Sequence, residues 1–203
     1  MTGGGRVLPV IDADRLPESA PLFQRIAVIG LGSVGLSLAM ALRQAWPPSL
    51  VIGVDAPEAL EAAVRLNAVD VGAADLMIAA EADLIVLAGS SEENVRVLAH
   101  LEGAIAGQAV ILAIGGDSRT LAGSSRSLPG RMPLAAALPS VVSPGEDLAA
   151  ARPTLFLGRP WYLTQVTAPE DTVERLQGLI RAIGGRPVVT PAAQYDELIA
   201  SAA

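Results

Sequence analysis

The chain has 203 residues, of which 51% are apolar and 3% aromatic, and its formal net charge is −7. This length can bury one substantial core, and the negative charge argues against nucleic acid as a partner, because nucleic-acid-binding proteins present a basic face. Cysteine is absent and histidine occurs once, which excludes disulfides, cysteine nucleophiles and multi-histidine metal sites, so no metal is expected. Neither a targeting segment nor a basic amphipathic helix is visible, so we expect a cytoplasmic protein without membrane contact.

The first 24 residues differ in composition from the rest of the chain. They contain three consecutive glycines and three prolines around one apolar patch. This pattern predicts a surface arm over residues 1–24, with an edge strand at residues 7–11, and a lid over a ligand site is the alternative. The folded domain is therefore expected over residues 25–203.

The most informative stretch is residues 26–42, an uncharged apolar run that contains Gly30, Gly32 and Gly35. A G-x-G-x-x-G spacing between a strand and a helix is typical of dinucleotide-binding domains. Gly30 would allow a sharp turn, Gly32 would let a pyrophosphate approach the backbone, and Gly35 would let the helix pack closely on the strand. Backbone N–H groups at the start of the helix would face the phosphates. The residues expected to bind a cofactor here are Gly30, Gly32, Ser33, Val34 and Gly35.

The second predicted strand, residues 50–55, ends in Asp55. A carboxylate at this place can accept hydrogen bonds from the adenosine ribose and would repel the 2′-phosphate of NADP, so NAD is the expected cofactor. NADP is the less favoured alternative, in which Arg65 would reach back toward the phosphate. The competing interpretation is an ordinary strand–turn–helix whose glycines serve only packing.

The middle of the chain continues the alternation of strands and helices. Residues 57–66 and 92–101 are predicted helices, 74–80 a helical segment, and 69–71 a small strand. The apolar run at residues 83–90 is typical of a buried parallel strand. Its end should lie beside the glycine turn, because ligands of open α/β sheets bind at that edge. This adds Ala88, Gly89 and Ser90 to the expected cofactor site, whereas His100, late in a helix, is expected to be solvated.

The last part of the chain is predicted to complete the sheet. Expected strands are residues 109–115, 132–138, 154–157, 161–164 and 187–190, and expected helices are 167–183, with a capping box from Thr167 to Glu170, and 192–203. Asp117 and Ser118 follow a strand, where they would cap the next helix or touch a ligand. The alternation predicts an α/β fold with a doubly wound, mostly parallel Rossmann sheet and helices on both faces.

Five segments resemble one family. They are residues 30–39, 52–55, 82–88, 155–164 and 195–200. The chain resembles the nucleotide-binding N-terminal domain of the prephenate dehydrogenase family, within the wider 6-phosphogluconate-dehydrogenase-like Rossmann proteins. The resemblance implies an NAD(P)-dependent oxidoreductase that oxidises and decarboxylates prephenate or arogenate in tyrosine biosynthesis.

The resemblance also shows departures at the positions that carry chemistry. The family's proton-accepting histidine corresponds here to Leu138, and leucine cannot accept a proton. A second family histidine corresponds to Tyr195, and the family's Gly-Ser-x-Lys segment becomes residues 115–119. The catalytic group is thus unknown, with Asp117, Ser118 and Tyr195 as the candidates. The family's helical C-terminal domain, which forms the dimer and most substrate contacts, is expected to be lacking.

These observations leave three hypotheses for the function. The first is a prephenate-dehydrogenase-like oxidoreductase that lacks full activity as this chain, and the second is a non-catalytic dinucleotide-binding regulatory or interaction module. The third is a reductase of another small-molecule substrate. Leu198 and Ile199 on the final helix would offer an interface to a second copy or a partner chain.

Overall fold

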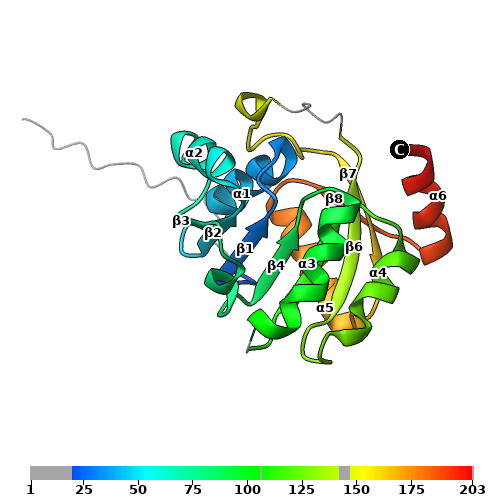
Figure 1. Cartoon of the computed structure of the whole chain (residues 1–203). Coiled ribbons are helices and arrows are strands. Elements are labelled where there is room, and N and C mark those ends of the chain that lie inside the picture. Colours follow the sequence, from blue (N-terminus) through cyan, green and yellow to red (C-terminus); the bar gives the residue numbers. More distant parts are fainter. Residues whose placement is uncertain (1–19, 106, 142–146, 203) are drawn as a thin grey trace, which may run out of the picture.

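The computed structural model describes residues 20–105, 107–141 and 147–202 (Figure 1). The strand expected at residues 7–11 and most of the predicted arm lie outside the described residues. Within them, eight strands form one sheet in the order β3-β2-β1-β4-β5-β6-β7-β8. The strands are β1 (Arg25–Ile29), β2 (Leu50–Val54), β3 (Val71–Ala73), β4 (Leu84–Leu87), β5 (Val110–Ile114), β6 (Leu134–Pro139), β7 (Pro160–Gln165) and β8 (Arg186–Val189).

The direction of the strands confirms a doubly wound, mostly parallel sheet. Neighbours from β3 through β6 run parallel, β7 runs antiparallel to β6, and β8 runs parallel to β7. The chain builds outward from β1 through β2 to β3, then returns to place β4 on the other side of β1. This reversal creates a crevice at the carboxyl ends of the strands, where open α/β sheets bind ligands.

Helices cover both faces of the sheet, with α3 and α4 in front of it and α5 behind it in Figure 1. The helices are α1 (Ser33–Ala45), α2 (Pro57–Arg65), α3 (Ser91–Ala104), α4 (Ser118–Ser124), α5 (Glu170–Ala182) and α6 (Ala192–Ala202). Apolar residues of α1, α2 and α5 pack into one core cluster, and those of α3, α4 and α6 pack into another. Nine of the 13 residues of α1 are buried, because the helix packs against β1 and β2.

Two local predictions near the ends of elements are wrong. Residues 154–157 form hydrogen-bonded turns instead of a strand, because Phe156 folds inward and packs on Trp161, with ring centroids 5.0 Å apart. The capping box at Thr167 does not form: its hydroxyl accepts a hydrogen bond from Leu134 N at 3.0 Å, and Pro169 is the N-cap of α5. The helical segment predicted at residues 74–80 is a short 3-10 helix, η1 (Leu76–Ala79).

Residues before β1 also belong to the packed core of the domain. Phe23 is fully buried, contacts Trp46 and lies beneath the guanidinium of Arg175, 4.4 Å from the ring centroid. The backbone N–H groups of Gln24 and Arg25 both donate to the Asp83 carboxylate. The core therefore begins two residues before the expected boundary at residue 25. None of the helices in the described ranges is both long and apolar enough to span a membrane.

Candidate functional site

The turn between β1 and α1 is tight because two glycines in it leave no room for a side chain. Gly30 has φ +94°, and a Cβ there would lie 2.5 Å from the backbone nitrogen of Gly89 at the end of β4. A Cβ on Gly35 would overlap the carbonyl oxygen of Gly30. These contacts place the first turn of α1 directly against the ends of β1 and β4.

Gly32 differs from its two neighbours in the motif. It is the N-cap of α1 and exposed, and a Cβ built on it meets no atom within 4 Å. Its φ of −62° is open to any residue, so neither packing nor backbone conformation requires glycine here. The space in front of Gly32 is therefore available to a ligand that approaches the backbone.

That space is part of a cleft of about 510 Å³ at the carboxyl edge of the sheet. Its lining residues are Ile29, Gly30, Gly32, Val54, Asp55, Ala74, Leu76, Ala88, Gly89, Ser90, Glu93, Asn94 and Val97. Residues that are distant in sequence and were predicted to bind a cofactor meet in it: Gly30, Gly32, Asp55, Ala88, Gly89 and Ser90. The other three expected residues, Ser33, Val34 and Gly35, belong to the first turn of α1 and do not line it.

Asp55 holds the glycine turn to the end of β2. Its Oδ2 accepts a hydrogen bond from Leu31 N at 2.5 Å, and its Oδ1 accepts one from Ala56 N at 2.6 Å. A carboxylate has about four acceptor positions, so these bonds orient the group and leave capacity for ligand hydroxyls. Arg65, the residue considered for NADP, is exposed in the last turn of α2 and does not line the cleft.

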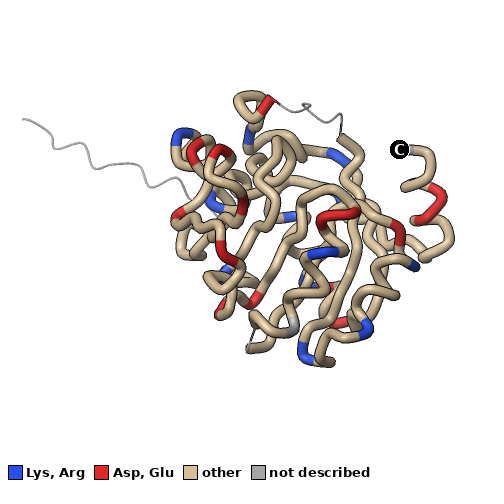
Figure 2. The backbone as a smooth tube through the Cα atoms, viewed as in Figure 1, with Lys and Arg blue, Asp and Glu red and all other residues tan. Residues whose placement is uncertain are grey.

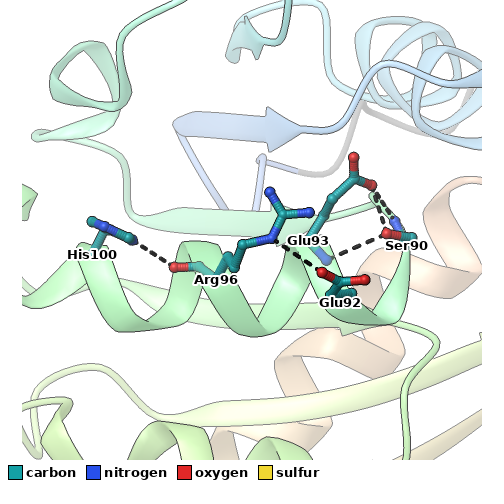
Figure 3. Close-up of polar contacts among 5 residues, drawn as sticks. All are labelled: Ser90, Glu92, Glu93, Arg96 and His100. Atoms are coloured by element: carbon teal, nitrogen blue, oxygen red, sulfur yellow. Dashed lines mark hydrogen bonds and ion pairs between the residues drawn. The ribbon is translucent and has the colours of Figure 1, made fainter.

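Ser90 and Glu93 form a capping box at the start of α3, drawn in Figure 3. Glu93 Oε2 accepts hydrogen bonds from Ser90 N at 2.8 Å and from Ser90 Oγ at 2.7 Å, and Ser90 Oγ accepts from Glu93 N at 3.3 Å. The bonds from Ser90 lower the pKa of Glu93, so this cleft residue is an anion at neutral pH. Glu93 was not among the residues predicted from the sequence, although Ser-x-x-Glu after an apolar strand is a signal for a helix start.

Asn94 is a second cleft residue that the sequence analysis missed. It is 2% exposed, its Oδ1 accepts from Gly89 N at 3.2 Å, and its Nδ2 donates to Ile114 O at 3.1 Å. The amide thus joins the carboxyl ends of β4 and β5. No local pattern marks an asparagine for such a role, because both partners lie outside its own helix.

The three catalytic candidates lie together but do not line this cleft. Asp117 is the N-cap of α4, where its bonds to Thr120 lower its pKa. Ser118 donates from N and Oγ to Asp196 of α6, at 2.7 and 3.0 Å. Tyr195 is fully buried, and burial, with the nearby Asp196 and Asp117 carboxylates, raises the pKa of its hydroxyl. Ser118 therefore joins α4 to α6, whereas the buried Tyr195 hydroxyl has no hydrogen-bond partner among the described residues.

Leu138 and His100 can also be placed. Leu138 lies at the end of β6, half-buried against the cluster that contains α3, α4 and α6. His100 is exposed on α3, with Nδ1 2.7 Å from the carbonyl oxygen of Arg96, and does not line the cleft (Figure 3). In the backbone view of Figure 2, arginine positions and acidic positions are both distributed over the fold.

Comparison with known proteins assigns the chain to a family. The profile of the nucleotide-binding domain of prephenate dehydrogenase matches residues 38–189. The chain belongs to the prephenate dehydrogenase family. A curated relative, the probable prephenate dehydrogenase NovF of Streptomyces niveus, is 30% identical over 186 residues, which cover 85% of this chain and 47% of that protein. The chain thus spans about half the length of this relative.

Solved structures of the family share the fold. Prephenate dehydrogenase from Aquifex aeolicus matches with a TM-score of 0.77 and 17% identity over 85% of this chain and 63% of that chain. Arogenate dehydrogenase from Synechocystis matches with a TM-score of 0.77 and 23% identity, over 87% of this chain and 63% of that chain. A second structure of the A. aeolicus enzyme, in complex with hydroxyphenyl propionate and NAD+, matches with a TM-score of 0.77 and 18% identity. The match covers 86% of this chain and 62% of that chain.

Proposed function

We propose that the folded part of the chain, from Phe23 onward, is an NAD-binding domain whose cofactor lies in the cleft at the ends of β1, β2 and β4. The observation that carries this proposal is the open space at Gly32, beside an oriented carboxylate at Asp55. A glycine that packing does not require is explained if a ligand takes the space of the missing side chain. The family's nucleotide-binding domain and the NAD+ complex of a relative support the same assignment.

The residues of the cleft fit the parts of a dinucleotide. Asp55 would accept hydrogen bonds from the hydroxyls of the adenosine ribose, and the backbone around Gly32 would contact the pyrophosphate. Leu76 and Val97 offer apolar walls that would exclude water from the adenine. Bound NAD supplies a hydride acceptor at its nicotinamide ring.

The charge of the cleft favours NAD over NADP. Both ionisable residues that line it, Asp55 and Glu93, are acidic, and no arginine of the described chain lines it. A 2′-phosphate at the adenosine ribose would lie against Asp55 without a cation to neutralise it. The proposed partner is therefore NAD, and a cytoplasmic location and a small-molecule substrate stay predictions from the sequence.

Titration of the purified protein with NAD and then NADP tests this proposal. We expect NAD to bind more tightly, and Asp55→Ala to weaken NAD binding by about 1–3 kcal/mol, since hydrogen bonds to a charged acceptor are lost. Glu61→Ala, which removes the same charge from an exposed position of α2, should leave the affinity unchanged. Equal affinities of the wild type and Asp55→Ala for NAD would refute the assignment of Asp55.

For catalysis we propose that this chain does not by itself oxidise prephenate at a useful rate. The resemblance places the family's proton acceptor at Leu138, which has no basic atom. One alternative is a non-catalytic dinucleotide-binding module, favoured because Asp196 holds the Ser118 hydroxyl and Tyr195 is fully buried, and the other is a reductase of another small substrate. If the chain instead acts as a prephenate-dehydrogenase-like oxidoreductase of tyrosine biosynthesis, a partner chain or a further domain would complete the enzyme.

A steady-state assay checks this proposal. With prephenate and NAD, we expect the purified chain to form NADH no faster than a sample without protein, when absorbance at about 340 nm is followed. The assay is informative only if the same preparation binds NAD in the titration above. Sustained NADH production at enzymatic rates would show that another group accepts the proton.

A further inference from the structure

We propose that Glu93 is the second ribose-binding carboxylate of the cleft. It accepts hydrogen bonds from the hydroxyls of the nicotinamide ribose, which lies beyond the pyrophosphate. This inference rests on the proposed NAD binding and adds a residue that sets affinity for the far half of the dinucleotide. It assigns Asp55 and Glu93 to the two riboses, one on each side of the glycine turn.

The position of Glu93 follows from its contacts with the end of β4. Its side chain lies over Gly89, so that a Cβ on Gly89 would be 3.1 Å from Oε2 and 3.2 Å from the Glu93 Cβ. Gly89 in turn lies against Gly30 in the turn after β1. The strand order β2-β1-β4 therefore places Asp55, the glycine turn and Glu93 in sequence along the carboxyl edge.

Glu93 has acceptor capacity that its structural role does not use. Both hydrogen bonds from Ser90 go to Oε2, and Figure 3 shows the other carboxylate oxygen pointing away from Ser90. Because an ionised carboxylate only accepts hydrogen bonds, it is complementary to ribose hydroxyls and repels phosphate. A hydroxyl-bearing sugar is thus the part of a dinucleotide that this oxygen fits.

The neighbouring Glu92 shows that capping and helix charge alone do not explain Glu93. Both residues lie in the first turn of α3, where a negative charge favours the helix dipole. Glu92 points elsewhere, pairs with Arg96 at 3.8 Å, and does not line the cleft (Figure 3). Glu92→Gln is therefore a matched control that changes the same charge in the same helical turn.

The experiment compares ADP-ribose, which contains the far ribose, with ADP, which ends at the pyrophosphate. Glu93→Gln keeps an oxygen that can accept from Ser90 and removes the charge. We expect it to weaken ADP-ribose and NAD binding by about fivefold to tenfold, as the loss of a charge-assisted hydrogen bond predicts, with ADP binding unchanged. Asp55→Ala should weaken all three ligands, Glu92→Gln none, and the thermal unfolding midpoints of the glutamine variants should agree.

The outcomes separate this inference from the proposed function. If the wild type binds neither NAD nor ADP-ribose, the proposed function fails, and the inference fails with it. If the wild type binds them and Glu93→Gln binds ADP-ribose equally well, the inference alone is overturned. Tighter binding of both ADP and ADP-ribose by Glu93→Gln would show that Glu93 faces the phosphates, which also overturns it.

Discussion

Gly32→Ala is expected to weaken NAD binding by roughly tenfold to a hundredfold, the equivalent of about 1–3 kcal/mol for forcing a methyl group into an occupied space. In the protein alone the new Cβ meets nothing within 4 Å, and the backbone of Gly32 is extended, with φ −62° and ψ −179°. Only a ligand lying against this backbone would collide with the methyl group. The measurement is calorimetric titration of the variant with NAD.

The fold should remain intact in this variant. Gly32 is the N-cap of α1, where alanine is less favourable than glycine by no more than about 1 kcal/mol. Gly103→Ala serves as the control, since Gly103 lies on α3 outside the cleft and also has open space around it. Unchanged NAD affinity in Gly32→Ala would mean that the cofactor does not approach this backbone, and the proposed binding mode would be wrong.

Gly35→Ala is expected to lower the free energy of unfolding by about 3 kcal/mol, at the upper end of typical overpacking costs. The added Cβ would overlap the carbonyl oxygen of Gly30 and lie 3.0 Å from its carbonyl carbon. Both are backbone atoms in a turn already held at φ +94°, so no side chain can swing away. Helix α1 would have to move off the strands, although nine of its residues are buried there.

Thermal unfolding measures this effect. For a domain of this size, 1 kcal/mol shifts the midpoint by about 2–4 °C, so a drop of roughly 6–12 °C is expected. Gly123→Ala in α4 is the matched control, because its Cβ would meet open space in a helix and should leave the midpoint equal or higher. A midpoint for Gly35→Ala that matches the wild type would contradict the close packing of α1 on the turn.

Together these variants separate two uses of glycine within one motif. Gly30 and Gly35 are required by atoms of the chain itself, whereas Gly32 is required by nothing that the structure describes. The sequence pattern treats the three alike and assigns their roles only by analogy with other dinucleotide-binding turns. The environment of each position turns that analogy into different expected results for stability and for binding.

Local patterns were sufficient for most of the fold. The buried strands β1, β2, β4 and β5 consist mainly of Val, Ile, Leu and Ala, and their alternation with helices predicted the parallel sheet. The spacing Gly30, Gly32, Gly35 with Asp55 at the next strand end located the cleft, because each strand ends at the same edge. The Asp117 cap was also expected, since its partner is only three residues away.

The remaining features depend on contacts between distant segments, and the tertiary structure alone decided them. Phe156 packs on the buried ring of Trp161 and is itself fully buried. This packing gives the apolar run at residues 154–157 a turn conformation instead of a strand. The role of Asn94 depends on its hydrogen bonds to the ends of β4 and β5. The role of Ser118 depends on its hydrogen bond to the carboxylate of Asp196, 78 residues away. The sequence by itself determined the strand–turn–helix units and their glycine motif, because those depend on neighbours in the chain. Which side chains face the cleft and which fasten helices together depends on packing between units, which no local pattern encodes.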